Sequence, residues 1–181
     1  MGQFKYQKRY RELHQQHPKW FSGALKSVSV QEITQLVKDT GAKTILDYGS
    51  GKGYQYLKAR VHEAWGILPT CYDPGVVQLQ DPPAEGTKFD GVICTDVMEH
   101  ISQTDIDELL KNLFGYIGKR GFAYFAICCR PARKEFPDGV NVHLTVMSPR
   151  WWNQKLSQYK RDGLIIRADY EVKDDPSSYD D

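Results

Sequence analysis

Charge of one sign is what this sequence lacks most clearly. Its 181 residues contain 24 Lys and Arg against 23 Asp and Glu, which leaves a formal net charge of +1. Proteins that contact many phosphates usually carry a basic excess, so the overall charge gives no support for DNA as a partner. The stretch 5–11 is a local exception, because it holds four basic residues and two tyrosines. It predicts a solvated helix face or, as the alternative, an arm that binds nucleic acid.

Long apolar runs and cysteines with metal-site spacing are lacking as well. No segment approaches the length of a membrane-spanning helix, and no apolar stretch of a secretion signal follows the basic N-terminus. The four cysteines are Cys71, Cys94, Cys128 and Cys129, and the first three fall in or beside predicted buried strands. We therefore expect reduced thiols, a cytoplasmic location and no membrane partner.

The chain is long enough for one domain with a substantial core but too short for two independent domains. We predict a single domain over 1–173 that begins with a helical arm over 1–23. The acidic tail 174–181 is expected to be disordered.

Apolar runs and helical stripes alternate along the chain. Ser29 and Glu32 have the spacing of a capping box, and the helix that they open is expected to stop at Gly41. Segment 130–149 is predicted to be a long functional loop. The predicted strands are 44–46, 67–72, 89–95, 121–128 and 164–170, and the later helices are 54–64, 104–118 and 151–159. This alternation predicts an α/β domain with a mainly parallel sheet and helices on both faces.

A glycine turn follows the first predicted strand. A phosphate-binding Walker loop is excluded, because Leu46 stands where its first glycine is needed and Gly53 replaces its final Ser or Thr. A dinucleotide fingerprint is weakened, because Tyr54 occupies the position of a small residue that lets helix and strand pack closely. A nicotinamide-dependent oxidoreductase therefore stays open only as a minor alternative.

The pattern Asp47-x-Gly49-x-Gly51-x-Gly53 closely resembles the first motif of the class I S-adenosylmethionine-dependent methyltransferases. Asp73, at the end of the next predicted strand, matches the acid that accepts hydrogen bonds from both ribose hydroxyls in that family, and segment 89–101 resembles its fourth-strand motif. The resemblance implies a Rossmann-like fold with S-adenosylmethionine as cofactor. The cofactor-binding residues that it implies are Asp47, Tyr48, Gly49, Gly51, Asp73, Pro74 and Asp96.

One segment departs from this family. Between Asp73 and Phe89 the chain is too short for the usual helix and third strand, so we expect a sheet that is shortened at this edge. The usual acid beside the adenine is consequently missing, unless Asp81 or Glu85 replaces it.

The end of the third predicted strand carries a candidate metal site. If a helical turn begins at Asp96, Glu99 and His100 return to the same face, and His143 in the long loop could reach them. This set resembles the divalent-metal site of small-RNA 2′-O-methyltransferases, which implies Mg²⁺ or Mn²⁺, although two imidazoles also attract Zn²⁺. The alternative is that Glu-His only orients the cofactor, as is common in class I enzymes.

These observations predict an S-adenosylmethionine-dependent methyltransferase that modifies an oxygen or nitrogen of a small-molecule, nucleoside or RNA acceptor. His143 is the first candidate for the catalytic base, followed by His100 and Asp96. Four aromatic residues could wall the acceptor pocket: Trp20, Phe21, Trp151 and Trp152. The alternative function is a regulatory module that binds S-adenosylmethionine without methyl transfer.

Overall fold

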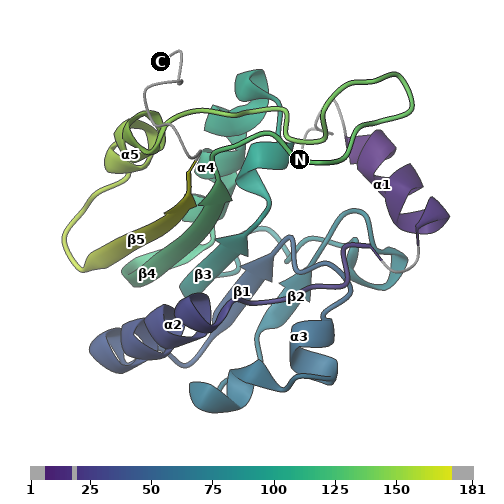
Figure 1. Cartoon of the computed structure of the whole chain (residues 1–181). Coiled ribbons are helices and arrows are strands. Elements are labelled where there is room, and N and C mark those ends of the chain that lie inside the picture. Colours follow the sequence, from purple (N-terminus) through teal and green to yellow (C-terminus); the bar gives the residue numbers. More distant parts are fainter. Residues whose placement is uncertain (1–6, 18–19, 173–181) are drawn as a thin grey trace.

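The computed structural model describes residues 7–17 and 20–172. Its centre is a five-stranded sheet in the order β2-β1-β3-β4-β5, and each neighbouring pair is parallel (Figure 1). The strands are β1 Ile45–Tyr48, β2 Thr70–Tyr72, β3 Phe89–Thr95, β4 Ile117–Cys128 and β5 Leu164–Glu171. The predicted Rossmann-like α/β fold is therefore confirmed.

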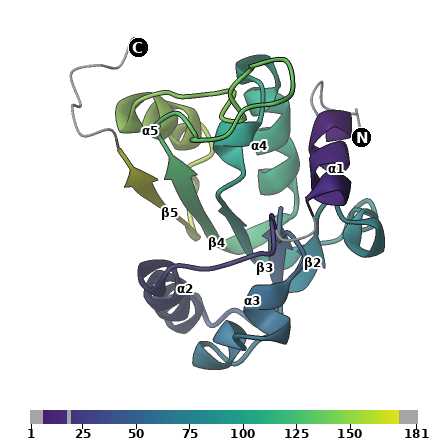
Figure 2. The same ribbon diagram turned by 45° about the vertical axis from the view of Figure 1, so that its right-hand side comes forward.

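Helices cover both faces of the sheet (Figures 1 and 2). On one face, α2 (Ser27–Thr40) and α3 (Tyr54–Leu57) bury apolar side chains such as Ile33 and Tyr56 against Phe122 of β4. On the other face, α4 (Ile106–Gly115) and α5 (Pro149–Ser157) bury Leu110 and Trp152 against Phe125. Because both faces are covered, the central strands read as almost continuous apolar runs.

Several predicted boundaries were wrong for local reasons. α2 begins at Ser27 and has no side-chain cap, so Ser29 is a buried residue of its first turn rather than a capping residue. The predicted helix 54–64 is divided into α3 and a 3₁₀ turn, Val61–Ala64, because Arg60 lies between them with a left-handed φ of 53°. A 3₁₀ turn, Gln103–Asp105, precedes α4, which ends at Gly115 rather than Gly118.

The sheet is shortened at the predicted edge, and β2 is its outermost strand on that side. The chain between β2 and β3 holds one 3₁₀ turn, Val77–Leu79. The four cysteines are free thiols, and no helix in the described ranges is long and apolar enough to cross a membrane. The tail 174–181 falls outside the described residues.

The N-terminal helix α1 (Gln7–Gln16) is packed against the loop between β4 and α5. Leu13 of α1 is buried together with Phe136 and Val142 of that loop, in a third apolar cluster that is separate from the two cores of the sheet. This cluster holds the arm and the loop together above the carboxyl end of the sheet (Figure 2).

Candidate functional site

A cavity of about 330 Å³ opens where β1, β2 and β3 end. Open parallel sheets bind ligands at this edge, outside the carboxyl ends of their strands. The walls come from the turns after these strands and from the N-terminal arm. The lining includes Tyr48 at the end of β1 and Gly49, Ser50 and Gly51 after it, Asp73, Pro74 and Gly75 after β2, Thr95 at the end of β3 and Asp96, Val97, His100 and Asp105 after it, and Tyr10, His14, Phe21 and Gly23 of the arm.

Two glycines of the turn are needed for its shape. Gly49 has a φ of 82°, and a Cβ there would lie 2.2 Å from Cγ2 of Val97. Gly51 has a φ of 57°, and a Cβ there would lie 2.5 Å from the carbonyl oxygen of Phe21. Only a residue without a side chain allows this backbone conformation together with such close contacts.

The arm occupies backbone donors that a phosphate would need. The amide of Lys52 donates to the carbonyl oxygen of Phe21 at 3.2 Å, and the amide of Tyr54 donates to Ser22 at 3.1 Å. α3, which follows the turn, has four residues. A pyrophosphate or Walker site depends on free amides at such a helix start, so these contacts argue against both alternatives.

Asp73 lies at the cavity wall with its carboxylate fixed by backbone amides. Oδ2 accepts from the Gly51 amide and Oδ1 accepts from the Gly75 amide, each at 2.8 Å. Each carboxylate oxygen can accept a second hydrogen bond. Asp73 is therefore placed to accept hydrogen bonds from two neighbouring hydroxyls of a ligand.

Asp47 lies beneath the glycine turn and not in the cavity lining. It is buried, and its Oδ2 accepts from the Tyr56 hydroxyl at 2.7 Å and from Nε2 of Gln55 at 3.0 Å. Burial raises the pKa of Asp47 to about 6. Nε2 of Gln55 also donates to the Ser50 carbonyl at 3.1 Å. The side chain of Gln55 therefore connects Asp47 to the glycine turn.

Neither acid proposed for the adenine side lines the cavity. Asp81 and Glu85 are exposed in the short segment between β2 and β3. The side chains that sequence reasoning missed here are Tyr10 and His14 of α1. Their spacing of four residues places them on one face of a helix, and this spacing was the feature of the sequence that could have indicated a shared surface.

The expected four-residue metal set is divided in the structure. Asp96 lines the cavity with a left-handed φ of 54°, and a 3₁₀ turn, Met98–His100, follows it instead of an α-helical turn. One ligand atom from each of Glu99, His100 and His143 lies within 4.8 Å of the others. His100 also lines the cavity, whereas Glu99 and His143 are not part of its lining.

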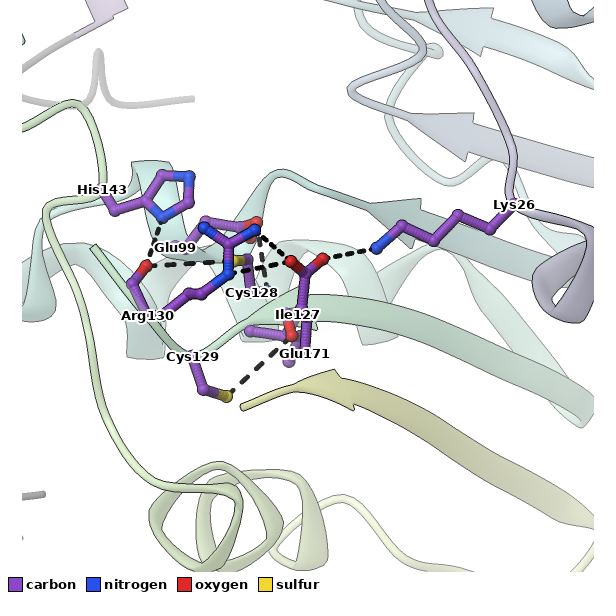
Figure 3. Close-up of polar contacts among 8 residues, drawn as sticks. All are labelled: Lys26, Glu99, Ile127, Cys128, Cys129, Arg130, His143 and Glu171. Carbon is purple, nitrogen blue, oxygen red and sulfur yellow. Dashed lines mark hydrogen bonds and ion pairs between the residues drawn. The ribbon is translucent and has the colours of Figure 1, made fainter. Parts of the chain in front are cut away.

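Both imidazoles are oriented by carbonyl groups. Nδ1 of His100 lies 2.9 Å from the Val142 oxygen. Nδ1 of His143 lies 2.6 Å from the Arg130 oxygen, a contact that Figure 3 shows. Because a carbonyl can only accept, each Nδ1 carries the proton and each Nε2 keeps its lone pair. Burial lowers the pKa of His100 to about 4 and also lowers the pKa of His143. Both rings are therefore neutral near pH 7.

Glu99 is the third member of this cluster and is completely buried. Its Oε1 accepts from the Cys128 amide at 3.1 Å, while Oε2 has no hydrogen-bond partner among the described residues. Burial raises the pKa of Glu99 to about 8. Its carbonyl oxygen accepts from the amides of Leu144 and Thr145 at 2.7 and 3.0 Å, which holds the loop beside His143.

An ion cluster borders the same region (Figure 3). Glu171 at the end of β5 accepts from Nζ of Lys26 at 2.6 Å and from Nε of Arg130 at 2.9 Å. These two cations lower the pKa of Glu171. The cluster joins the segment before α2 to the start of the long loop.

The two tryptophans of α5 are not cavity residues. Trp152 is fully buried in the core of the sheet, and Trp151 packs against the same core. Trp20 also lies outside the cavity lining, whereas Phe21 forms part of it. The predicted aromatic wall is thus reduced to Phe21, together with Tyr10, because α5 points its apolar face toward β4 and β5.

Comparison with known proteins gives one family match. The profile described as "Methyltransferase domain" matches residues 7–161 of this chain. A search of curated proteins finds no match.

Proposed function

The chain belongs to the methyltransferase domain family, and from this premise we propose that it binds S-adenosylmethionine in the cavity and transfers its methyl group. The acceptor in this proposal is an oxygen or nitrogen atom of a small molecule, a nucleoside or an RNA. The observation that carries the proposal is the placement of Asp73 beside a glycine turn whose amides are already hydrogen-bonded within the chain.

The lining has the chemistry that this cofactor needs. The turn at Gly49 and Gly51 offers a surface without side chains to the methionine part, and Asp73 offers an acceptor to the ribose hydroxyls. No phosphate has to be bound, which agrees with amides that contact Phe21 and Ser22. Aromatic rings such as Phe21 exclude water and favour a sulfonium cation.

The residues of the chain contribute mainly by positioning. Methyl transfer from a sulfonium is an in-line displacement, so holding the acceptor in line supplies much of the rate acceleration. Asp96 at the cavity wall is the carboxylate best placed to take a proton from the acceptor. His143, the first choice from the sequence, does not line the cavity, so we assign it a different task.

That task is metal binding, which we include in the proposal. In the proposal, the ligand atoms are Nε2 of His100, Nε2 of His143 and Oε2 of Glu99, because both Nδ1 atoms contact carbonyls and Oε2 has no partner among the described residues. A two-His, one-carboxylate set suits Zn²⁺, Mn²⁺ or Fe²⁺ better than Mg²⁺. The carbonyl contacts at both Nδ1 atoms are the outer-shell bonds typical of such ligands. If bound there, such an ion would supply Lewis-acid chemistry, which lowers the pKa of a hydroxyl that coordinates it.

Cobalt provides a test of the metal site that does not depend on activity. We expect Co²⁺ to give visible absorption bands with the wild-type protein, and E99Q and H143A to lose them. H62A is the matched control, because His62 lies outside the cluster near α3 and should leave the bands unchanged. Bands that persist in both cluster variants would exclude this site.

The cofactor is tested by thermal unfolding and by methyl transfer. S-adenosylhomocysteine at about 100 times its dissociation constant should stabilise the fold by roughly 2.7 kcal/mol, while NAD should not. Label from methyl-labelled S-adenosylmethionine should then enter the small-molecule or RNA fraction of a cell extract. Cofactor binding without transfer to either fraction would favour the regulatory module instead.

A further inference from the structure

Helix α1 is attached to the turn after β2, on the side where the sheet is short (Figures 1 and 2). Nε and Nη2 of Arg11 donate to the carbonyl oxygen of Pro74 at 3.2 and 3.1 Å. One helical turn further, His14 rests on Gly75. A Cβ at position 75 would lie 2.9 Å from Cδ2 of His14 and 3.1 Å from Oδ1 of Asp73. His14 and Asp73 therefore border the same part of the cavity.

The ring of His14 has a fixed orientation. It is stacked on Phe21, with 4.5 Å between the ring centroids and 8° between the ring planes. Phe21 is itself held by its carbonyl contact with the glycine turn. Nδ1 of His14 is buried and makes no hydrogen bond with any residue that the structure describes. A ligand in the cavity therefore cannot reach Nδ1, but the opposite ring edge is open to it: a Cβ at position 75 would lie 3.0 Å from Nε2 of His14, beside Asp73. Nε2 makes no hydrogen bond with the described residues, so it is free to bind a polar group of a ligand.

We infer that Nε2 of His14 binds the nucleoside part of the cofactor, so that the N-terminal arm supplies a wall that the shortened sheet edge does not provide. The inference rests on the proposed function. A nucleoside offers hydroxyls and ring nitrogens, and Asp73 can only accept hydrogen bonds from them. A neutral imidazole can donate or accept, and it takes the place left by Asp81 and Glu85, which do not reach the cavity.

Three substitutions at position 14 separate a hydrogen bond from packing. Asn places a polar atom near the position of Nδ1, Gln places one near Nε2, and Ala removes both. H14N and H14Q lose the aromatic stacking on Phe21 equally, so a difference between them reports on the polar atom. H17A is the matched control, since His17 follows α1 and stacks on Trp20 outside the cavity lining.

Calorimetry with S-adenosylhomocysteine and with 5′-methylthioadenosine is the deciding measurement. The second probe keeps the nucleoside and lacks the amino-acid part. We expect H14A and H14N to weaken both probes by about tenfold, which is the value of one hydrogen bond. H14Q should retain most of the affinity and H17A all of it.

Two results would overturn the inference while leaving the proposed function intact. One is wild-type affinity in H14A, and the other is an equal loss in H14A, H14N and H14Q, which would make His14 a packing residue. A loss confined to S-adenosylhomocysteine would also overturn it, because the contact would then lie at the methionine part. A wild-type protein that binds neither probe would reject the proposed function, and the inference with it.

Discussion

The hydroxyl of Tyr10 lies 3.1 Å from Nδ1 of His100, and both groups donate to the carbonyl oxygen of Val142. Three segments far apart in the sequence therefore meet at one oxygen atom: α1, the turn after β3 and the long loop. His100 is also a ligand of the proposed metal site, so the arm and that site are connected directly.

We predict that Y10F loosens the arm without unfolding the sheet. The substitution removes one hydroxyl and keeps the ring that packs on Phe136. The loss of such a hydrogen bond costs about 1 kcal/mol. Hydrogen exchange should become faster in 7–16 and 131–143 and stay unchanged in β3 and β4. Unchanged exchange in both segments would show that the shared carbonyl does not hold the arm.

A second prediction concerns the glycine turn. G49A should abolish binding of S-adenosylhomocysteine, because the added Cβ would meet Val97 and displace the turn. G86A is the matched control. Gly86 has the same φ of 82°, and a Cβ there would meet nothing within 4 Å. Equal binding by the two variants, measured by calorimetry, would contradict the assigned role of the turn.

The third prediction is a pH dependence of stability due to Asp47. Its folded-state pKa of about 6 lies above the ordinary value of 3.8, so the folded state binds the extra proton between these values. The free energy of unfolding should therefore fall as pH rises from about 4 to 6, by roughly 3 kcal/mol from this group. D47N should lack that decrease.

Urea unfolding of D47N and wild type between pH 4 and pH 7 measures the difference. D90N serves as the contrasting control, because the amides of Lys43 and Thr44 lower the pKa of Asp90. Its carboxylate stabilises the fold above the unfolded-state pKa, and this contribution is lost on acidification. Parallel pH profiles for D47N and wild type would refute the assignment.

The fourth prediction tests the small apolar cluster beneath the arm. L13A removes a buried side chain that packs against Phe136 and Val142. A buried Leu→Ala substitution typically costs about 2 to 5 kcal/mol. We expect the loss to appear as faster dissociation of S-adenosylhomocysteine, with little change in the main unfolding transition. L57A, which alters an exposed leucine of α3, should change neither quantity. A lowered main transition in L13A with an unchanged dissociation rate would show that the cluster belongs to the global core.

The parallel sheet could be predicted because its signals are local. Apolar runs such as Phe89–Thr95 coincide with strands, and the glycines after Asp47 mark a turn that no other residue type allows. The position of Asp73 could be predicted for the same reason, since it directly follows the next strand and parallel strands end at the same edge of the sheet. These features need no knowledge of the remaining chain.

The metal cluster could be predicted only in part. Its prediction assumed an α-helical turn from Asp96, but Asp96 has a left-handed conformation and a 3₁₀ turn follows. This geometry turns Glu99 inward while Asp96 stays at the cavity. The role of His14 depends on the hydrogen bond from Arg11 to the carbonyl oxygen of Pro74. This contact spans 63 residues of sequence, and no local pattern predicts it.

The separate cluster of Leu13, Phe136 and Val142 has a consequence for the rate at which a ligand is released. We predict that a ligand beneath α1 leaves faster when these three side chains separate, which they can do while the two cores of the sheet stay packed. In the proposed function, the lifetime of this contact would limit how long the product stays and how soon the next cofactor enters. The rate of turnover would then be set by the local opening of this apolar cluster rather than by the methyl-transfer step.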